Sequence, residues 1–351
     1  MNIQQQFEAF HETIKLGRFE ENQILREKRD IIKDKLELEL PKIFERYGEK
    51  CPAFSFRDQG SYEMGTGTKP LYGDYDIDQG LYFMASTADY PNPVILKKRV
   101  HKALDGHTQQ VRIRQSCVTV FYQQAGEPIY HVDIAVYSDG EMNADSVDRL
   151  AKGKEYSTEE YRFWEVSNPQ GLRDTLLAGF EREIDRDQFR RIVRYLKRWK
   201  DENFLKDGNA APRGIGLTIL AYDHLQPSYT NDLDCDANDL EALRILVRAT
   251  LNRFSYIWDD VEQKSVRRLV VPLPVEPRND LFGRLTNCHM EDFEQKLKEV
   301  QEALDAAAIE VDPAEACKHL QRVFGADFPV PLKEGTAKRH APAIISSSSS
   351  A

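Results

Sequence analysis

The sequence predicts an α+β protein in which a lobe built on a mixed sheet precedes a mostly helical lobe. Segments with the composition of strands fall before residue 145, and later segments repeat apolar residues with the period of an α-helix. The chain has 351 residues, 41% hydrophobic and 30% charged, which is enough for two domains of ordinary size. We therefore expect a sheet-containing domain over residues 1–150 and a helical domain over residues 151–332.

In the first lobe, apolar residues at helical spacings among charged ones predict a long helix over residues 20–47. Pro41 lies inside this pattern and should kink or divide the helix. Four strands are predicted next, with one helix between the second and the third. The strands are CPAFSFR, DYDIDQGLYF, VRIRQSCVTVFYQ and PIYHVDIAVY, and the helix is PVILKKRVHKAL.

The second lobe is predicted to be helical because its apolar residues recur with a helical period and show little β-branched alternation. The helical segments are TEEYRFWEVSN, GLRDTLLAGFEREID, RDQFRRIVRYLKRWKDENF, GIGLTILAYDHL, LEALRILVRATLNRF and MEDFEQKLKEVQEALDAA. The last segment, KEGTAKRHAPAIISSSSSA, is small and polar and has nothing to bury. Residues 333–351 are therefore expected to form a disordered tail.

Composition and charge narrow the classes of function. A net charge of -10 and a pI near 5.4 disfavour broad nucleic-acid binding as the main role, although a local basic groove is still allowed. No apolar run approaches the ~18 residues of a membrane span and no signal segment is seen, so we expect a cytoplasmic protein without a membrane partner. The cysteines are scattered, form no zinc motif and are expected to be reduced: Cys51, Cys117, Cys235, Cys288 and Cys317.

Three aspartates crowd the segment DYDIDQG. On a strand, alternate side chains share a face, so the carboxylates of Asp74, Asp76 and Asp78 would lie ~7 Å apart. Like charges at that distance repel, and Ile77 and the run 80–83 argue against full solvation. The cluster should therefore raise its own pKa values or bind a cation.

Three common ligand-binding motifs are excluded by residues that do not match them. An EF-hand calcium loop that starts at the first aspartate needs Gly and Glu where the chain has Gln79 and Ala85. No Gly-Lys-Ser/Thr follows Gly60 at the distance that a P-loop requires. The segment GTG at 65–67 lacks the third glycine of a dinucleotide-binding fingerprint.

The Gly60-Ser61 turn and the strand aspartates, which fit none of these three motifs, suit nucleotide chemistry. Backbone N–H groups and a hydroxyl at the Gly60-Ser61 turn can hold phosphate oxygens, and paired carboxylates can hold Mg²⁺, which prefers oxygen ligands. In-line phosphoryl transfer with two ions ~3.5–4 Å apart usually needs a third carboxylate on a neighbouring strand. Asp133, a lone acid in the apolar strand IYHVDIAVY, is either that ligand or a salt-bridged core acid, since an unpaired buried carboxylate is costly.

With these motifs in view, the chain resembles the DNA polymerase β-type nucleotidyltransferases. More narrowly, it resembles the bacterial relatives of animal cyclic GMP-AMP synthase and oligoadenylate synthase, the CD-NTases. The matching runs are DQGSYEMGT, DYDIDQGLYF and HVDIAVY, and the likeness extends more loosely to about residue 332. It implies a polymerase β-like nucleotidyltransferase core, a mixed sheet with helices and a long N-terminal spine helix, joined to an oligoadenylate-synthase-like helical lobe.

The resemblance also implies a role for each matching residue. Gly60 and Ser61 match the turn that binds the donor triphosphate, and Gln59 beside them is an expected nucleotide contact. Asp74 lies outside the matched acids and is assigned to the approach loop. The residues expected to bind metal, and so to be catalytic, are Asp76, Asp78 and Asp133.

A basic helix in the second lobe offers a further phosphate contact. In RRIVRYLKRWKDEN, the side chains of Arg190, Arg194 and Lys197 share one helical face. A lysine before a tryptophan at this place in the family reaches the β- and γ-phosphates of the donor. We therefore expect Lys197 to bind nucleotide, the alternative being a surface lysine. The residues expected to face the core are Ile192, Leu196 and Trp199.

Some positions depart from the family pattern. Relatives often place a phosphate-binding serine at the start of the next helix, but the stretch PRGIGLTIL has none. Thr218 either replaces that serine as a nucleotide contact or points at its own helix backbone. Asp280, in PRNDLFGRL, falls where relatives contact the acceptor or the base. His131 is expected to be structural.

The reaction that the resemblance implies is attack of a ribose hydroxyl of one NTP on the α-phosphorus of another, with release of pyrophosphate and Mg²⁺ or Mn²⁺ as cofactor. A second attack would close a cyclic di- or trinucleotide, made from ATP, GTP or other NTPs, that activates an effector in anti-phage (CBASS) defence. The tail ending at Ala351 is either joined to a target by a ubiquitin-conjugation-like partner or inert. The alternative functions are template-independent transfer to RNA ends or a small molecule, and nucleotide binding without catalysis.

Overall fold

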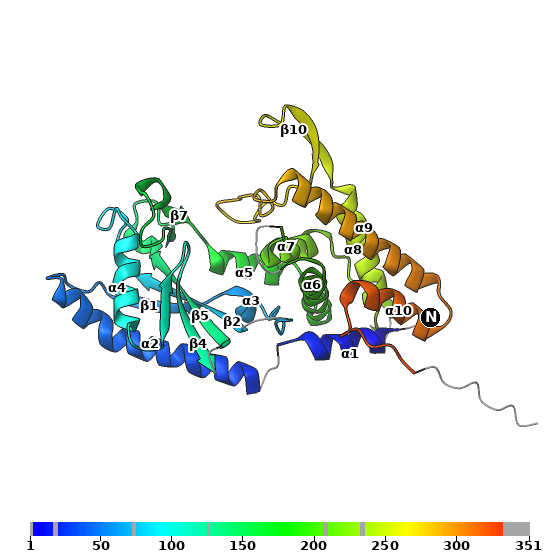
Figure 1. Ribbon diagram of the computed structural model, residues 1–351, viewed down its shortest axis with the longest axis horizontal. Helices are drawn as coiled ribbons and strands as arrows, with labels where there is room; N and C mark the ends of the chain where they lie inside the picture. The colour runs from blue at the N-terminus through cyan, green and yellow to red at the C-terminus, as the bar shows by residue number, and fades with distance from the viewer. Residues whose placement is uncertain are drawn as a thin grey trace, which may run out of the picture.

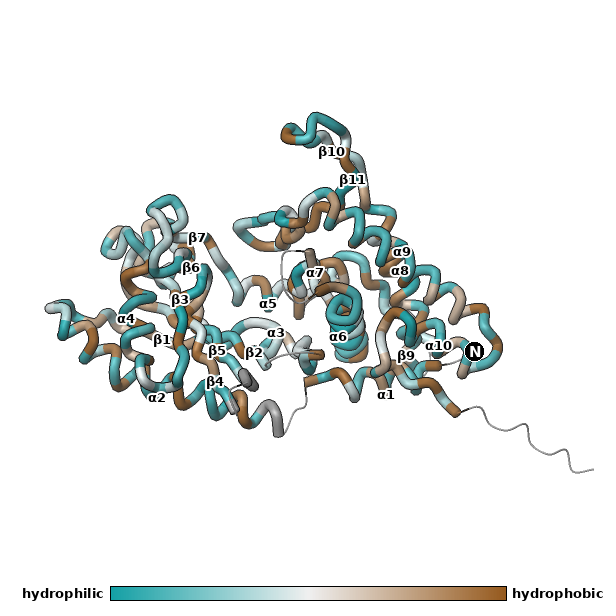
Figure 2. Tube along the Cα trace, in the orientation of Figure 1, coloured by the Kyte–Doolittle hydropathy of each residue, from teal (hydrophilic) through white to brown (hydrophobic). Residues whose placement is uncertain are grey.

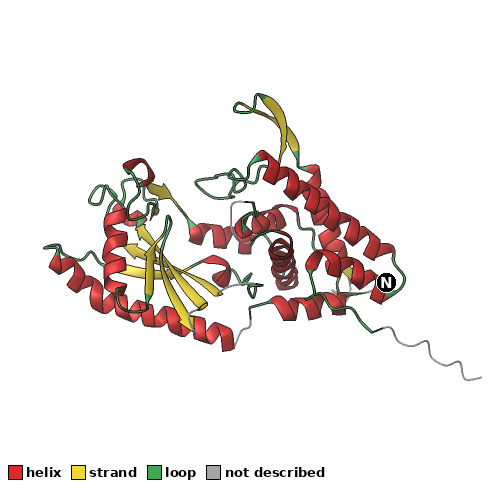
Figure 3. Ribbon diagram, viewed as in Figure 1, coloured by secondary structure: helices red, strands yellow, loops and turns green. Residues whose placement is uncertain are grey.

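The computed structural model describes residues 3–16, 20–71, 75–124, 127–205, 210–231 and 236–332. Two lobes lie side by side, one built on a sheet and the other on helices (Figure 1). Most of the strands lie in the first half of the chain, and helices dominate the second half (Figure 3). The predicted α+β class is confirmed.

A seven-stranded mixed sheet forms the centre of the first lobe. Its strands follow the spatial order β1-β2-β5-β4-β3, while β6 pairs with the end of β5 and β7 pairs with β6. β2 and β5 are parallel, and the other pairs are antiparallel. The bounds are β1 Phe54–Asp58, β2 Tyr75–Phe83, β3 Gln110–Ile113, β4 Val118–Gln124, β5 Glu127–Ser138, β6 Arg149–Ala151 and β7 Trp164–Val166.

Two helices, α2 (Glu20–Arg46) and α4 (Val94–Leu104), pack against one face of this sheet. Figure 2 shows apolar residues recurring among polar ones along α2. Pro41 lies inside α2 without dividing it, so the predicted division does not occur. Alternate residues of β2 and β5 share this apolar core with α2, which leaves their other residues to the opposite face. The shared core includes Leu25, Ile32, Leu36, Leu40, Ile77, Leu81, Val132, Ile134 and Val136.

Two predictions for this lobe need correction. The segment VRIRQSCVTVFYQ is a hairpin of β3 and β4 rather than one strand, because the chain reverses where Arg114 N–H donates to Cys117 O. Residues 158–168, expected to be helical, contain a single 3-10 turn and strand β7. Trp164 on β7 donates its indole N–H to Tyr90 O at 2.8 Å. Pairing with β6 and this tertiary contact therefore outweigh the local helical period.

The described part of the second lobe packs six helices around one apolar cluster. Their bounds are α5 Pro169–Ala178, α6 Glu183–Asn203, α7 Gly214–His224, α8 Asp239–Asn252, α9 Asn287–Ile309 and α10 Pro313–Phe324. Two hairpins that the helical periods did not predict lie among them, and β10 projects at the top of Figure 1. These strands are β8 Tyr229–Asn231, β9 Asp236–Ala237, β10 Ser255–Asp259 and β11 Lys264–Arg268. No helix among the described residues combines the length and apolar character needed to cross a bilayer.

The N-terminal helix α1 (Gln4–Ile14) belongs to the core of the helical lobe. In Figure 1 it lies below that lobe, while α2 runs below the sheet. Phe7 and Phe10 are fully buried, and Phe10 stacks on Tyr195 of α6 with ring centroids 5.3 Å apart. The described chain therefore starts in the helical lobe, crosses to the sheet and returns. The predicted domain bounds near residues 150 and 332 remain predictions.

A buried polar network ties α1, α6 and α8 together. Asp239, in the first turn of α8, is fully buried and accepts hydrogen bonds from Arg191 at 2.8 and 2.9 Å and from Gln188 at 2.9 Å. Its backbone N–H donates to Gln4 Oε1 of α1 at 2.9 Å. Burial acts to raise the pKa of Asp239, but the hydrogen bond and charge of Arg191 outweigh it and hold that pKa below its ordinary value. The three helices are thus joined by a charged pair inside the core.

We expect Asp239→Asn to lower the free energy of unfolding by roughly 3–5 kcal/mol, because the substitution leaves the Arg191 guanidinium buried without its counter-charge. Urea denaturation followed by circular dichroism would measure the change. The control is Asp292→Asn, which removes an exposed partner of Lys296 on α9 and should alter stability little. Equal losses in the two variants would contradict the role given to the network.

Candidate active site

The parallel register of β2 and β5 brings the predicted acids together. Asp76 lies opposite His131, and Asp78 lies opposite Asp133. Because alternate residues of a strand share a face, all four side chains project from one face of the sheet, away from α2 and α4. The two acids of DYDIDQG thus meet Asp133, which is far away in the sequence, as expected for a third carboxylate on a neighbouring strand.

Gly60 allows the Gly-Ser turn to approach Asp78 closely. Gly60 begins the short helix α3 (Gly60–Glu63) with a φ of +78°, in the left-handed region that favours glycine. A Cβ at this position would lie 1.8 Å from Asp78 Oδ2. Gln59, just before the turn, accepts a hydrogen bond from the Tyr137 hydroxyl at 3.2 Å. The turn therefore packs directly against a carboxylate, and no side chain fits between them.

Asp133 is held in place by the neighbouring strand. Thr119 on β4 donates its hydroxyl to Asp133 Oδ1 at 2.5 Å, and Cys117 Sγ lies 3.5 Å from Thr119 Oγ1. Burial and the negative charge of Asp76 raise the pKa of Asp133, against the lowering effect of the Thr119 hydrogen bond. Burial, together with the charges of Asp76 and Asp133, raises the pKa of Asp78 well above its ordinary value. The three acids therefore repel one another in a partly desolvated place.

His131 also lies at this site, although the sequence analysis assigned it a structural role. Its Nε2 is 3.0 Å from Asp76 Oδ1. One possible ligand atom from each of Asp76, His131 and Asp133 lies within 4.8 Å of the other two. The sequence carried a signal for this position, because His131 and Asp133 are alternate residues of the run HVD and so share a face of β5.

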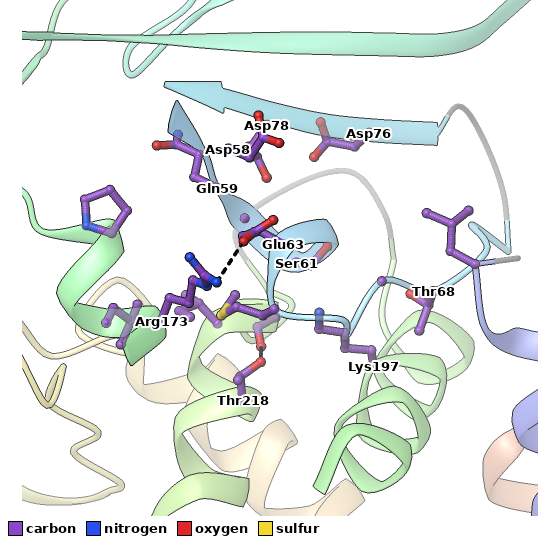
Figure 4. Close-up of a pocket in the computed structure, with 18 of the residues that line it drawn as sticks. Asp58, Gln59, Ser61, Glu63, Thr68, Asp76, Asp78, Arg173, Lys197 and Thr218 are labelled. Carbon is purple, nitrogen blue, oxygen red and sulfur yellow. Dashed lines mark hydrogen bonds and ion pairs between the residues drawn. The ribbon is translucent and has the colours of Figure 1, made fainter. Parts of the chain in front are cut away.

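A cavity of about 530 Å³ opens beside these side chains and extends to the helical lobe, a size typical of small-molecule sites. Figure 4 shows the β2 aspartates on one side, α3 in the middle, and Lys197 and Thr218 on the other side. Glu63 of α3 pairs with Arg173 of α5 at 3.2 Å, a contact that the sequence analysis did not anticipate. The predicted residues that line the cavity are Gln59, Gly60, Ser61, Asp76, Asp78, Lys197 and Thr218.

Lys197 reaches the cavity from α6 and is buried, so the alternative of a surface lysine is wrong. Its Nζ donates to Thr66 O at 2.9 Å and lies 3.3 Å from Thr66 Oγ1. Burial, with smaller effects from the positive charges of Lys200 and Arg194, lowers the pKa of Lys197 to about 7. Near neutral pH this amine can therefore gain a proton when an anion binds beside it.

The arginines of α6 do not all face the cavity. Arg194 donates to two carbonyl groups of the connector, residues 65–69, which follows α3, and Arg198 donates to a third. Arg190 instead pairs with two acids of its own helix. The basic face that the sequence predicts therefore serves mainly to hold the connector, whereas Lys197 lines the cavity. The three residues predicted to turn inward are buried: Ile192, Leu196 and Trp199.

Two predicted nucleotide contacts have local hydrogen-bond partners. Thr218 donates to Gly214 O of its own helix at 3.1 Å, the second of the two alternatives, although it also lines the cavity. Asp280 Oδ1 accepts from the N–H groups of Val271 and Phe282 at 3.0 Å each. Asp280 is not among the described residues that line the cavity, so its placement offers no support for a nucleotide contact. Two further residues of the sequence analysis lie outside the described part of the chain: Asp74 and Ala351.

The side chains at the sheet end of the cavity fit a divalent metal ion. Carboxylate oxygens and a histidine nitrogen are common metal ligands, and a bound cation would offset both the burial and the repulsion from Asp76 and Asp133 that raise the pKa of Asp78. Lys197 and Arg173 lie farther along the same cavity. The β2 aspartates on one side of the cavity and Lys197 on the other suit a phosphorylated substrate that a metal ion holds through its phosphate oxygens.

The fold consists of a polymerase β-like nucleotidyltransferase core joined to a helical lobe. Residues 54–137 match the family described as cyclic GMP-AMP synthase DncV-like, nucleotidyltransferase domain. A cyclic GMP-AMP synthase of Escherichia albertii is 25% identical over 185 residues, which cover 50% of this chain and 38% of that protein. The matched stretch thus spans well under half of the length of this curated relative.

Solved structures share the fold over nearly the whole chain. CdnC of E. coli, solved in a complex with HORMA-deltaN, has a TM-score of 0.62 and 20% identity, covering 93% of this chain and 98% of its own. The DncV cyclic AMP-GMP synthase of Vibrio cholerae has a TM-score of 0.60 and 17% identity, covering 92% and 97%. The same synthase was also solved with the linear intermediate 5′ pppA(3′,5′)pG. Together these likenesses confirm the resemblance to the CD-NTases.

We expect Gly60→Ala to displace the Asp78 carboxylate and to weaken divalent-cation binding by about tenfold or more, because the new methyl group would occupy the place of Asp78 Oδ2. Isothermal titration with Mn²⁺ would measure the affinity.

The matched control for Gly60→Ala is Gly48→Ala. Gly48 has a φ of +69°, and a Cβ there would meet nothing within 4 Å. Both variants therefore carry a similar backbone strain, but only Gly60→Ala should lose affinity for the cation. Unchanged Mn²⁺ binding by Gly60→Ala would contradict the close packing of the turn on Asp78.

Proposed function

We propose that this protein is a metal-dependent nucleotidyltransferase that joins NTPs into a cyclic di- or trinucleotide and releases pyrophosphate. The single observation that carries the proposal is the meeting of Asp76, Asp78 and Asp133 beside the Gly60-Ser61 turn, at one end of a cavity that Lys197 lines. The match of residues 54–137 to a nucleotidyltransferase domain family supports it. So do the likenesses to the cyclic GMP-AMP synthase of Escherichia albertii and to the DncV cyclic AMP-GMP synthase of Vibrio cholerae.

In this reaction the carboxylates of Asp76, Asp78 and Asp133 would hold Mg²⁺ or Mn²⁺. When bound, such ions lower the pKa of the attacking hydroxyl and neutralise charge on the leaving pyrophosphate. Thr119 keeps the Asp133 carboxylate oriented through its hydrogen bond to Oδ1. Asp78 is held against the first residue of α3, so the metal-binding acids and the phosphate-binding turn keep a constant separation.

The donor triphosphate would lie between α3 and α6. The first N–H groups of a helix have no partner within it, so the turn at Gly60 and Ser61 offers donors to phosphate oxygens. Lys197 would approach the same phosphates from the other side of the cavity and hold the leaving pyrophosphate. Catalysis by the protein then consists of positioning the two nucleotides and stabilising charge.

The ring would form by two similar steps. In the first, a ribose hydroxyl of one NTP attacks the α-phosphorus of the second, and the bond to the departing pyrophosphate breaks. The linear product keeps one triphosphate; a hydroxyl at its other end attacks the α-phosphorus of this triphosphate, and the β- and γ-phosphates leave as a second pyrophosphate. For a trinucleotide, a third NTP is added in the same way before the ring closes. The effector in anti-phage (CBASS) defence and a conjugation partner for Ala351 remain predictions from the resemblance.

Incubation of the full chain with the four labelled NTPs and Mg²⁺ or Mn²⁺ tests the proposal. We expect a phosphatase-resistant product, and we expect Asp76→Ala, Asp78→Ala and Asp133→Ala each to lower its rate at least about 100-fold, since each removes a metal ligand. Thin-layer chromatography followed by mass spectrometry would identify the product.

Asp105→Ala is the control for these substitutions, because it removes an exposed carboxylate at the end of α4 and should leave the rate unchanged. Circular dichroism checks that each variant is folded. A ladder of linear products would favour the RNA-end transferase, and the absence of any turnover would favour a nucleotide-binding protein without catalysis. Full activity in Asp133→Ala would refute the three-carboxylate site.

The lowered pKa of Lys197 predicts that triphosphate binding takes up a proton. At pH 8 an amine with a pKa of about 7 is mostly neutral, and a neighbouring triphosphate raises the pKa and so favours the charged form. We expect uptake close to one proton per bound ATP at pH 8, with affinity falling as the pH rises above about 7. Titration calorimetry in two buffers of different ionisation enthalpy would measure it.

Lys197→Met should abolish this uptake, whereas Lys200→Met, which removes a second lysine of the same cavity, should preserve it. The same uptake in Lys197→Met as in the unaltered chain would show that another group takes the proton.

A further inference from the structure

The strand face that carries the acids also carries an imidazole. His131 lies beside Asp76 in the β2–β5 register, and its Nε2 is 3.0 Å from Asp76 Oδ1. The side chain is only 13% exposed, and its ring packs against Phe121 with centroids 6.0 Å apart. The ring is therefore held with its nitrogen toward the carboxylate rather than free in solvent.

The three aspartates and the histidine on this face of β2 and β5 form two groups. Asp76, His131 and Asp133 each place one possible ligand atom within 4.8 Å of the others, close enough for a single ion to contact all three. The carboxylate of Asp78 lies instead against Gly60, on the side of the phosphate-binding turn. One metal position would thus be surrounded by a mixed nitrogen and oxygen set of side chains.

A nitrogen ligand changes which ion such a position prefers. Mg²⁺ demands near-ideal octahedral oxygen coordination and keeps several of its waters. Imidazole suits first-row transition metals, and Mn²⁺ accepts both carboxylate oxygens and histidine nitrogens. A site in which a histidine joins two carboxylates is therefore expected to differ from a site of carboxylates alone in its preference between Mg²⁺ and Mn²⁺.

We propose that His131 Nε2 is a ligand of the divalent ion bound between Asp76 and Asp133, and that this position consequently selects Mn²⁺ over Mg²⁺. The proposal rests on the proposed function, since it concerns the same metal-binding carboxylates. A rival role for His131 is to orient Asp76 by a hydrogen bond without touching the ion.

Pulsed electron paramagnetic resonance of the full chain with Mn²⁺, in the absence of nucleotide, separates these roles. A directly bound imidazole gives a nitrogen modulation in the electron spin echo, so we expect that modulation in the unaltered chain and its loss in His131→Gln. Glutamine retains an amide that can donate to Asp76, so a purely orienting histidine would leave metal affinity nearly intact in this variant.

Titration calorimetry gives the second readout. We expect His131→Gln to weaken Mn²⁺ binding by about 10–100-fold while changing Mg²⁺ binding far less. His101→Gln is the control, because His101 lies on α4 with its Nε2 3.2 Å from Val111 O and should leave both affinities and the nitrogen modulation unchanged. Absence of nitrogen modulation in the unaltered chain, or equal losses for the two ions, would overturn the proposal.

These measurements stand apart from the nucleotide assay. If Mn²⁺ binds through a nitrogen but no NTP is turned over, the inference about His131 holds and the proposed function fails. If a cyclic product forms equally well with Mg²⁺ and no nitrogen is bound, the proposed function holds and the inference fails.

Discussion

The rest of the site depends on the parallel, in-register pairing of β2 with β5. This pairing sets Asp76 and Asp78 beside His131 and Asp133, so that like charges share one face of the sheet. Burial, together with their mutual repulsion, raises the pKa of Asp78 and Asp133, and this arrangement would not persist in a loosely packed region. The opposite face is packed on α2 and α4, which holds the two strands rigidly enough to maintain the arrangement.

Three helices of the second lobe, α5, α6 and α7, line the cavity. α6 carries Lys197 into the cavity and holds the connector at residues 65–69 through Arg194 and Arg198. The buried charge of Asp239 joins α6 to α1 and α8 in turn. The position of Lys197 relative to the acids therefore rests on the core of the helical lobe as well as on the sheet. Changes far from the cavity that loosen this core are expected to affect the site.

Burial shifts pKa values in opposite directions on the two sides of the cavity. On the sheet side, desolvation acts against negative charge and raises the pKa of Asp78 and Asp133, and a bound cation would lower the pKa of both again. On the helical side, desolvation acts against positive charge and lowers the pKa of Lys197 to about 7, and an anion bound beside this amine would raise its pKa again. A metal-bound triphosphate would place a cation beside the acids and phosphate oxygens beside Lys197.

Local patterns in the chain were sufficient to predict the strands that bear the acids, the Gly60-Ser61 turn and most helices. Such patterns of period and residue type depend only on neighbours in sequence. Contacts with distant segments instead determine three features: the strand at Trp164, the function of the arginines on α6 and the place of His131. Trp164 pairs with another strand, and Arg194 binds a carbonyl far along the chain. His131 meets Asp76 only because β2 and β5 pair in this register. No local pattern specifies the register, since the strand with which another strand pairs can lie far away in the sequence.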